Sequence, residues 1–207
     1  MNRMKLYRTT FLLITFLALS VMSSAQRIQK DFLQKLHNSN DTITSIQSDF
    51  VQTRTLSIME EPLVSSGKFS YKKPGLMKWD QQHPTLYYFI LNGTSVIRFD
   101  GEKRKKMAAN SPQVSHFKDF ILGTVSGSML ESDQFLSTFT KKGDQVKIVL
   151  IPQQKAMLKR IGKIELVFGY EKMILLELKL IEAEGDEMTI RFSNQKYNAI
   201  TSNVLFD

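Results

Sequence analysis

Cysteine is absent from the 207-residue sequence, which excludes disulfides and thiolate metal ligands. The histidines stand apart, with no second histidine or carboxylate at the spacing of a metal site: His37, His83 and His116. We therefore expect no structural metal and no cofactor. A chain of this length can bury a core large enough to hold its fold without such crosslinks.

Motifs typical of enzymes are also missing. The carboxylates are scattered singly, and no glycine-rich phosphate loop follows a strand-like segment. The segment Gly123-Thr124-Val125-Ser126-Gly127 resembles a nucleophile elbow, but its serine stands one position too late and no strand leads directly into it. The sequence therefore predicts a protein that is not an enzyme.

Long apolar runs are absent apart from one near the N-terminus. Three basic residues precede that run: Arg3, Lys5 and Arg8. The run extends from Phe11 to Met22, and Ser23-Ser24-Ala25 then puts small residues at the positions that signal peptidase reads. Because a membrane-spanning helix needs roughly 20 apolar residues, we expect residues 1–25 to be a signal peptide. Residues 26–207 should form one soluble, exported domain.

The excess of positive charge is moderate. The formal net charge of +8 falls by three when the basic residues of the signal peptide leave. The only basic cluster is Lys103-Arg104-Lys105-Lys106, which lacks the interleaved aromatic residues or known module of a nucleic-acid-binding protein. We expect this cluster to be a solvated hairpin tip, and we expect no nucleic-acid partner.

Most of the remaining chain consists of short alternating segments separated by turn residues, as in an antiparallel sheet. Asn92-Gly93 and Asp100-Gly101 are strong hairpin signals, because these residues tolerate positive φ. Further turns are expected at Lys142-Gly143-Asp144 and near Gly169 and Gly185. The predicted strands lie within 46–55, 67–84, 85–91, 95–99, 102–108, 145–151, 160–168, 173–182 and 187–194, and strands resume from Phe139.

Helices are predicted at three places. Residues 27–38 carry an apolar stripe: Ile28, Phe32, Leu33 and Leu36. Ser111-Pro112 begins a second helix, which Gly123 ends, and residues 126–136 suggest a short third one. Since helices and strands do not alternate as in a doubly wound fold, we predict a mainly β (α+β) fold. It is a curved antiparallel sheet or unclosed β-barrel, with a helical lid over an apolar cavity.

The segment from Gly67 to Pro84 is the most informative part of the chain. It predicts a hairpin around Pro74-Gly75, where proline presets φ and glycine is free to take positive φ. One face of this hairpin carries large apolar side chains: Phe69, Tyr71, Met77 and Trp79. The pattern Gly-x-Phe-x-Tyr-Lys-(Arg or Lys)-Pro-x-x-(Met or Phe)-x-Trp, followed by a proline, resembles the signature of the LolA family. Phe50-Val51-Gln52 is similar to the Phe-x-Gln on the first strand of that family.

This resemblance is clear over about residues 28–110 and looser beyond. It implies a periplasmic protein that carries lipoproteins to the outer membrane, on an unclosed β-barrel with a helical lid. The implied partners are acylated lipoproteins, an inner-membrane lipoprotein-releasing ABC transporter and an outer-membrane acceptor. Without a cysteine at the cleavage site, the chain is not expected to be a lipoprotein itself, and we expect a monomer.

The sequence is rich in residues suited to an acyl-chain site, with 14 phenylalanines and 10 methionines. Core packing accounts for many of these, but a curved sheet with a helix across its mouth encloses more apolar surface than its own side chains fill. Methionine suits such a wall because its thioether adapts to varied shapes. The predicted cargo site comprises Phe50, Phe69, Tyr71, Met77, Trp79, Phe117, Phe120, Ile121 and Met129.

One position departs from the family pattern. The family usually has arginine before the hairpin proline, where it is implied to hold the lid shut through backbone carbonyls, and this chain has Lys73. A lysine offers a compact, mobile ammonium where arginine offers a rigid fork of donors. We therefore expect Lys73 to act as a weaker or differently placed latch, bonded to the segment from Val114 to Gly123.

Three functions remain open at this point. The first is a lipoprotein carrier. The second is a binder or carrier of free lipid or glycolipid, or an envelope sensor of lipoproteins, on the same fold. The third is a lipid hydrolase of unrecognised type, which would need a nucleophile and a base at the cavity mouth.

Overall fold

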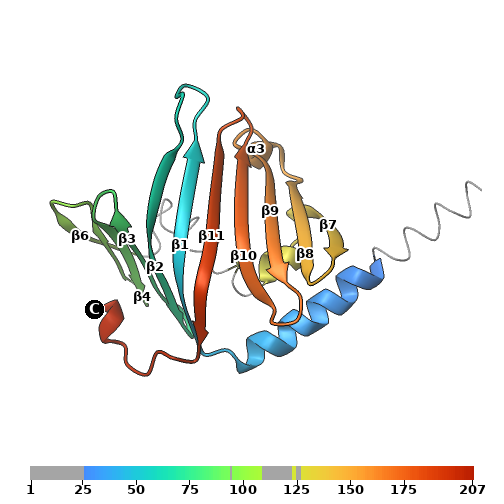
Figure 1. Ribbon diagram of the computed structural model, residues 1–207, viewed down its shortest axis with the longest axis horizontal. Helices are drawn as coiled ribbons and strands as arrows, with labels where there is room; N and C mark the ends of the chain where they lie inside the picture. Colours follow the sequence, from blue (N-terminus) through green and yellow to red (C-terminus); the bar gives the residue numbers. More distant parts are fainter. Residues whose placement is uncertain (1–25, 94, 109–122, 125–126) are drawn as a thin grey trace, which may run out of the picture.

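A computed structural model describes residues 26–93, 95–108, 123–124 and 127–207. Within these residues, eleven antiparallel strands form one curved sheet in the order β6-β5-β4-β3-β2-β1-β11-β10-β9-β8-β7 (Figure 1). The edge strands β6 and β7 are not paired with each other, so the sheet is open rather than a closed barrel. The predicted fold class is confirmed.

The strands are β1 (Ser45–Thr55), β2 (Leu63–Lys72), β3 (Leu76–His83), β4 (Tyr87–Asn92), β5 (Ser95–Phe99), β6 (Arg104–Ala108), β7 (Phe135–Lys142), β8 (Gln145–Pro152), β9 (Ile161–Gly169), β10 (Ile174–Glu182) and β11 (Glu187–Tyr197). Short helices occur at η1 (Ser128–Glu131), α3 (Lys155–Leu158) and η2 (Val204–Phe206). Neither α3 nor η2 was predicted.

Two meanders build the sheet, and one long-range pairing joins them. Hairpins connect β1 to β6 and β7 to β11 in chain order, and β1 then pairs with β11. Turn glycines with positive φ support these hairpins as predicted: Gly93, Gly101, Gly143 and Gly185. The register of β1 with β11 shifts between Gln47 and Asp49, which marks a β-bulge at the centre of the sheet.

The turn between β2 and β3 lies where it was predicted. Pro74 and Gly75 do form the turn, but Gly75 does not take a positive φ, and the Lys73–Pro74 peptide bond is cis. The predicted hairpin is confirmed, and Gly75 does not use the positive φ that glycine allows.

The helix predicted within residues 126–136 was wrong in most of its length. Only the 3₁₀ turn η1 is helical there, and β7 begins at Phe135, earlier than the expected return of strands at Phe139. Residues Phe135 to Lys142 pair in register with β8, and this pairing outweighs the local helical pattern.

The basic cluster also lies in a different place from the predicted hairpin tip. Arg104, Lys105 and Lys106 belong to the edge strand β6, and all are exposed. Charged side chains on an edge strand discourage pairing with other chains. The cluster therefore suits the open edge of this sheet.

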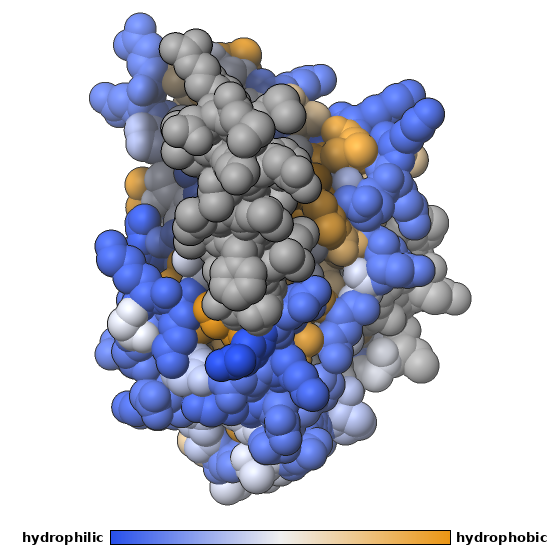
Figure 2. All heavy atoms as spheres, turned by 90° about the vertical axis from the view of Figure 1, so that its right-hand side faces the viewer, coloured by the Kyte–Doolittle hydropathy of each residue, from blue (hydrophilic) through white to orange (hydrophobic). Residues whose placement is uncertain are grey.

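The N-terminal helix spans residues 26–42 and is longer than the predicted 27–38. Its Phe32 is fully buried and packs against Phe139 and Phe168, with ring centroids 5.7 and 5.3 Å apart respectively. Figure 1 shows this helix running diagonally past the ends of β8 to β10. From the side that carries β7 and this helix, the coloured surface is largely hydrophilic with a few hydrophobic patches (Figure 2).

Several predictions fall on residues that are not described. The signal peptide (1–25) and most of the helix expected from Ser111 to Gly123 lie outside the described residues, and so do Phe117, Phe120 and Ile121. Gly123 and Thr124 are described and helical, so Gly123 does not itself end the helical conformation. In the described part of the chain, no helix is long and apolar enough to cross a membrane.

Candidate binding cavity

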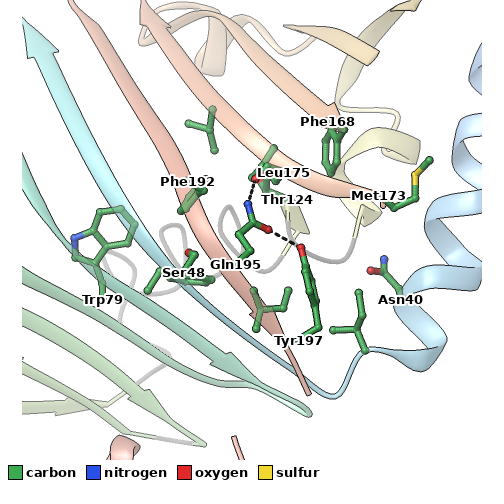
Figure 3. Close-up of a pocket in the computed structure, with 14 residues that line it drawn as sticks. Asn40, Ser48, Trp79, Thr124, Phe168, Met173, Leu175, Phe192, Gln195 and Tyr197 are labelled. Atoms are coloured by element: carbon green, nitrogen blue, oxygen red, sulfur yellow. Dashed lines mark hydrogen bonds between the residues drawn. The ribbon is translucent and has the colours of Figure 1, made fainter. Parts of the chain in front are cut away.

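An apolar cavity lies on one face of the sheet, where the two meanders meet. Strands β1, β2 and β3 supply one part of its wall and β9, β10 and β11 another, and the end of the N-terminal helix completes the rim. The cavity has a volume of about 50 Å³. Its described lining residues are Asn40, Ile43, Ile46, Ser48, Phe69, Trp79, Thr124, Phe168, Met173, Leu175, Leu178, Phe192, Gln195 and Tyr197 (Figure 3).

Aromatic side chains form a continuous wall across the junction of the meanders. The Trp79 ring stacks on Phe50 with centroids 3.8 Å apart, and Phe69 meets Trp79 edge-on at 6.3 Å. Phe69 also meets Phe192 of β11 edge-on at 6.0 Å. Stacked and edge-on pairs add to the stability that burial alone gives. These contacts hold Phe69 and Trp79 in place as a preformed apolar surface.

The strand period explains why these residues share one face. Alternate positions of β1 to β3 point inward, so Phe50, Phe69 and Trp79 are buried while Lys68, Lys78 and Asp80 lie on the other face. The register places Phe69 opposite Trp79, and Phe50 opposite both Gly67 and Phe192. The wall is therefore assembled from cross-strand neighbours.

A polar group lies within this apolar lining. Gln195 donates from Nε2 to the Leu175 carbonyl oxygen (2.6 Å), and its Oε1 accepts a hydrogen bond from the Tyr197 hydroxyl (2.5 Å) (Figure 3). Burial raises the pKa of the Tyr197 phenol, so this side chain is neutral at physiological pH. None of the described lining residues carries a formal charge. The cavity thus suits a neutral ligand.

Two of the predicted cargo-site residues, Phe69 and Trp79, line this cavity. Phe50, Tyr71, Met77 and Met129 are buried in the adjoining core and are not among its lining residues. Their role in binding, like that of the residues outside the described part, stays a prediction.

Most of the lining from the C-terminal meander was missed. The strands were predicted, but their position beside β1 depends on the β1–β11 pairing, which no local pattern reveals. A usable signal existed for β1, since Ile46, Ser48 and Phe50 alternate onto one face. A comparable signal in β11 is interrupted by the bulge, which shifts the alternation between Phe192 and Gln195.

Lys73 contacts a residue of the cavity lining. Its ammonium Nζ donates to the carbonyl oxygen of Asn40, at the end of the N-terminal helix, and its backbone N–H donates to the Thr44 carbonyl (2.9 Å). A cation suits this place because helix C-termini carry partial negative charge. The expected partners between Val114 and Gly123 lie almost entirely outside the described residues, so the contact with that segment stays a prediction.

No three His, Asp or Glu side chains gather closely enough to hold a metal ion within the described part of the chain. The described lining residues of the cavity include no histidine. The lining side chains that carry a hydroxyl group are Ser48, Thr124 and Tyr197.

The fold and the cavity together define a class: an open antiparallel sheet that holds an apolar cavity on one face. Within that class the chain belongs to the LolA family, because the family model described as outer membrane lipoprotein carrier protein LolA matches residues 41–207. The resemblance seen in the sequence is confirmed, and the match continues through the C-terminal meander.

Two curated relatives agree with this assignment. The chain is 23% identical to an outer-membrane lipoprotein carrier protein of Azotobacter vinelandii over 206 residues, covering 99% of this chain and 94% of the relative. It is 25% identical to a protein of the same name from Pseudomonas paraeruginosa over 196 residues, covering 94% and 90%. Membership supports a role as a carrier or binder of lipoproteins.

A solved structure shares the fold at lower sequence identity. The MucA/MucB complex of Pseudomonas aeruginosa contains a chain with a TM-score of 0.53 and 13% identity, covering 86% of this chain and 60% of that one. At this identity the likeness concerns the fold alone.

Proposed function

We propose that this protein binds the acyl chains of lipoproteins in the cavity of its open sheet and carries them from the inner to the outer membrane. The observation that carries the proposal is the uncharged, largely apolar cavity beside the aromatic wall, in a member of the lipoprotein-carrier family. Each acyl methylene removed from water is worth about 0.8 kcal/mol, so one long chain gains on the order of 10 kcal/mol.

Binding of such cargo requires the cavity to widen. The space of about 50 Å³ suffices for a few water molecules and not for a long acyl chain. An open sheet can widen more easily than a closed barrel, because its edge strands β6 and β7 are not tied to each other. We infer that cargo enters by separating the elements at the rim, and that closure helps to release it.

We propose a cellular setting that family membership and the expected signal peptide support. The exported chain, beginning at Gln26, is a soluble monomer in the periplasm. It accepts lipoproteins from an inner-membrane ABC transporter and passes them to an outer-membrane acceptor. Lys73 latches the rim through its ammonium group, and the lid expected between Ser111 and Gly123 stays a prediction.

Trp79 provides a direct test, because it is the only tryptophan of the chain and lines the cavity. A synthetic triacylated cysteinyl peptide with brominated acyl chains should quench Trp79 fluorescence saturably, since bromine quenches only at short range. The same peptide without acyl chains should not quench. Absence of saturable quenching by the acylated peptide would contradict the proposed function.

The nature of the natural cargo needs a second measurement. Mass spectrometry of material that co-purifies with the protein from an envelope extract should identify triacylated peptides. Free lipid or glycolipid in their place would favour the alternative function on the same fold.

A further inference from the structure

Ser48 is an exception among the buried polar groups of the part of the chain that the structure describes. Its side-chain hydroxyl lines the cavity, the residue is only 5% exposed, and Oγ has no hydrogen-bond partner. Among the described residues it is the one buried side-chain polar atom in this condition. Buried polar groups are nearly always paired, so an unpaired one in a cavity points to a partner that the protein itself does not supply.

The position of Ser48 in the sheet explains why no neighbour satisfies it. On one side it lies opposite Phe69 of β2, which offers no polar atom in its side chain. On the other side it faces the bulge in the β1–β11 register, beside which Gln195 enters the cavity. The Gln195 amide already bonds Leu175 and Tyr197. Figure 3 shows Ser48 in view between Trp79 and this amide.

A hydroxyl can donate one hydrogen bond, and the surroundings select the acceptor. Because the described lining is uncharged and mostly apolar, a phosphate or a free carboxylate would be costly to bury there. The ligand group must therefore accept a hydrogen bond and carry no charge. A neutral carbonyl attached to a hydrocarbon chain does both, and its chain can lie along the aromatic wall.

We propose that Ser48 donates a hydrogen bond to the carbonyl oxygen of an acyl ester or amide, so that the cavity binds the linkage of the acyl group as well as its hydrocarbon tail. This inference rests on the proposed function and names the cargo group that the site recognises. It makes Ser48 a specificity residue that distinguishes an acyl chain from an alkyl chain of equal length.

Two neutral probes separate these chemistries: monododecanoylglycerol and monododecylglycerol, which differ only in a C=O against a CH₂ next to the glycerol oxygen. Binding of each to the wild-type protein is followed by Trp79 fluorescence. The wild type should bind the acyl probe about fivefold more tightly, the effect of one net hydrogen bond. Ser48→Ala should lose that preference by weakening the acyl probe alone.

Matched variants keep the test interpretable. Ser48→Ala should be at least as stable as the wild type without ligand, because it removes an unsatisfied buried hydroxyl. Ser48→Cys, with a similar shape and a weaker donor, should show a reduced preference and serves if the alanine variant does not fold. Ser70→Ala, which alters a buried serine of β2 outside the cavity lining, should keep the full preference.

Each other outcome overturns the inference in a distinguishable way. Equal binding of both probes by the wild type would contradict carbonyl recognition by Ser48 and leave the proposed function intact. A preference that survives in Ser48→Ala would place carbonyl recognition elsewhere. Equal weakening of both probes in that variant would mean that Ser48 holds a water or only packs. Binding of neither probe by the wild type would count against the proposed function as well.

Discussion

Adjacent residues of β11 face opposite sides of the sheet and should differ sharply in their effect on cargo. Phe192 lines the cavity and contacts Phe69, whereas the Arg191 side chain is 65% exposed and pairs with Glu177 at 2.8 Å. Phe192→Glu should weaken binding of an acylated probe at least tenfold, because a buried carboxylate costs several kcal/mol or draws water inward. Arg191→Gln should change it little, since exposed ion pairs contribute about 0–1 kcal/mol.

Titration of Trp79 fluorescence with the brominated probe measures both variants, and circular dichroism verifies that each is folded. Equal loss of binding in the two folded variants would contradict the assignment of Phe192 to the cargo site.

Tyr197 gives a pH-dependent test of the polar group in the cavity. Burial raises its pKa in the folded state, while the unfolded chain ionises at the ordinary value of about 10. The folded state then holds more protons above that pH, so its contribution to stability is complete below about pH 10 and is lost as the pH rises further. Between about pH 8 and about pH 11, the free energy of unfolding should therefore fall less in Tyr197→Phe than in the wild type.

Urea unfolding at these two pH values gives the comparison. At the lower pH, Tyr197→Phe should be less stable by about 1 kcal/mol, because it lacks the hydrogen bond to Gln195. Identical alkaline losses in both proteins would show that Tyr197 ionises normally in the fold. Tyr71 and Tyr87, whose pKa values burial also raises, are unchanged in the variant and affect both proteins alike.

At the scale of single residues, the sequence predicted the faces of β1 to β3 well and the composition of the cavity less well. Alternation is a local property, so the inward direction of Phe69 and Trp79 could be deduced from neighbours alone. Whether Met77 reaches the cavity or stays in the core depends on how the sheet curves, which its own strand does not encode. The unpaired state of Ser48 depends on the bulge of a strand far away in the sequence.

At the scale of elements, Gly67 explains why the signature hairpin begins with glycine. A Cβ at this position would collide with the carbonyl oxygen of Asp80 and lie 2.8 Å from Cα of Gln81, next to a shift in the β2–β3 register. Gly67→Ala must therefore move the backbone of one strand, and we expect it to lower the free energy of unfolding by about 1–3 kcal/mol or more.

Gly75 in the turn of the same hairpin is the matched control. Its φ is not positive, and a Cβ there would meet nothing within 4 Å. Gly75→Ala should be neutral or stabilise by up to about 1 kcal/mol, because alanine restricts the unfolded chain. Thermal or urea unfolding of both variants is decisive: equal effects would mean that the close approach of β3 to Gly67 is not maintained in solution.

Prediction of helices and strands succeeded where local residues specify a turn. It failed where pairing with a distant strand determines the structure of a segment. The hairpins at Gly93, Gly101, Gly143 and Gly185 follow from residues that accept positive φ. By contrast, Phe135 begins a strand because this segment pairs with β8. The spacing of its apolar residues alone is equally consistent with a helix. Short apolar runs are ambiguous between the two structures for this reason.

At the scale of the whole molecule, access to the cavity depends on contacts between elements at its rim. Asn40 near the end of the N-terminal helix and Ile43 just after it belong to the lining. Asn198 holds the next residues by accepting a hydrogen bond from the Thr44 backbone N–H (2.7 Å). Lys73 adds a link from the β2–β3 turn to the Asn40 carbonyl. If the cavity widens at this rim, the Lys73 link must be strained or broken.

Removing the Lys73 donor should therefore loosen the rim. Lys73→Leu keeps most of the stem but deletes a cation at a helix C-terminus, worth about 0.3–1 kcal/mol, so amide exchange in residues 40–44 should accelerate about two- to fivefold. Uptake of the brominated probe should accelerate as well, while Lys73→Arg, which keeps the donor, should preserve slow exchange.

The control is Lys72→Leu, which removes an equal charge from the neighbouring residue. Because Lys72 Nζ bonds the Thr201 carbonyl instead (3.3 Å), this variant should leave exchange in residues 40–44 unaffected. If Lys73 also bonds the segment expected to be the lid, exchange across residues 112–123 will change in parallel. Should the Leu variant match the wild type in both segments and in uptake rate, Lys73 is a surface residue, and the cavity is opened by separation of other contacts at the rim.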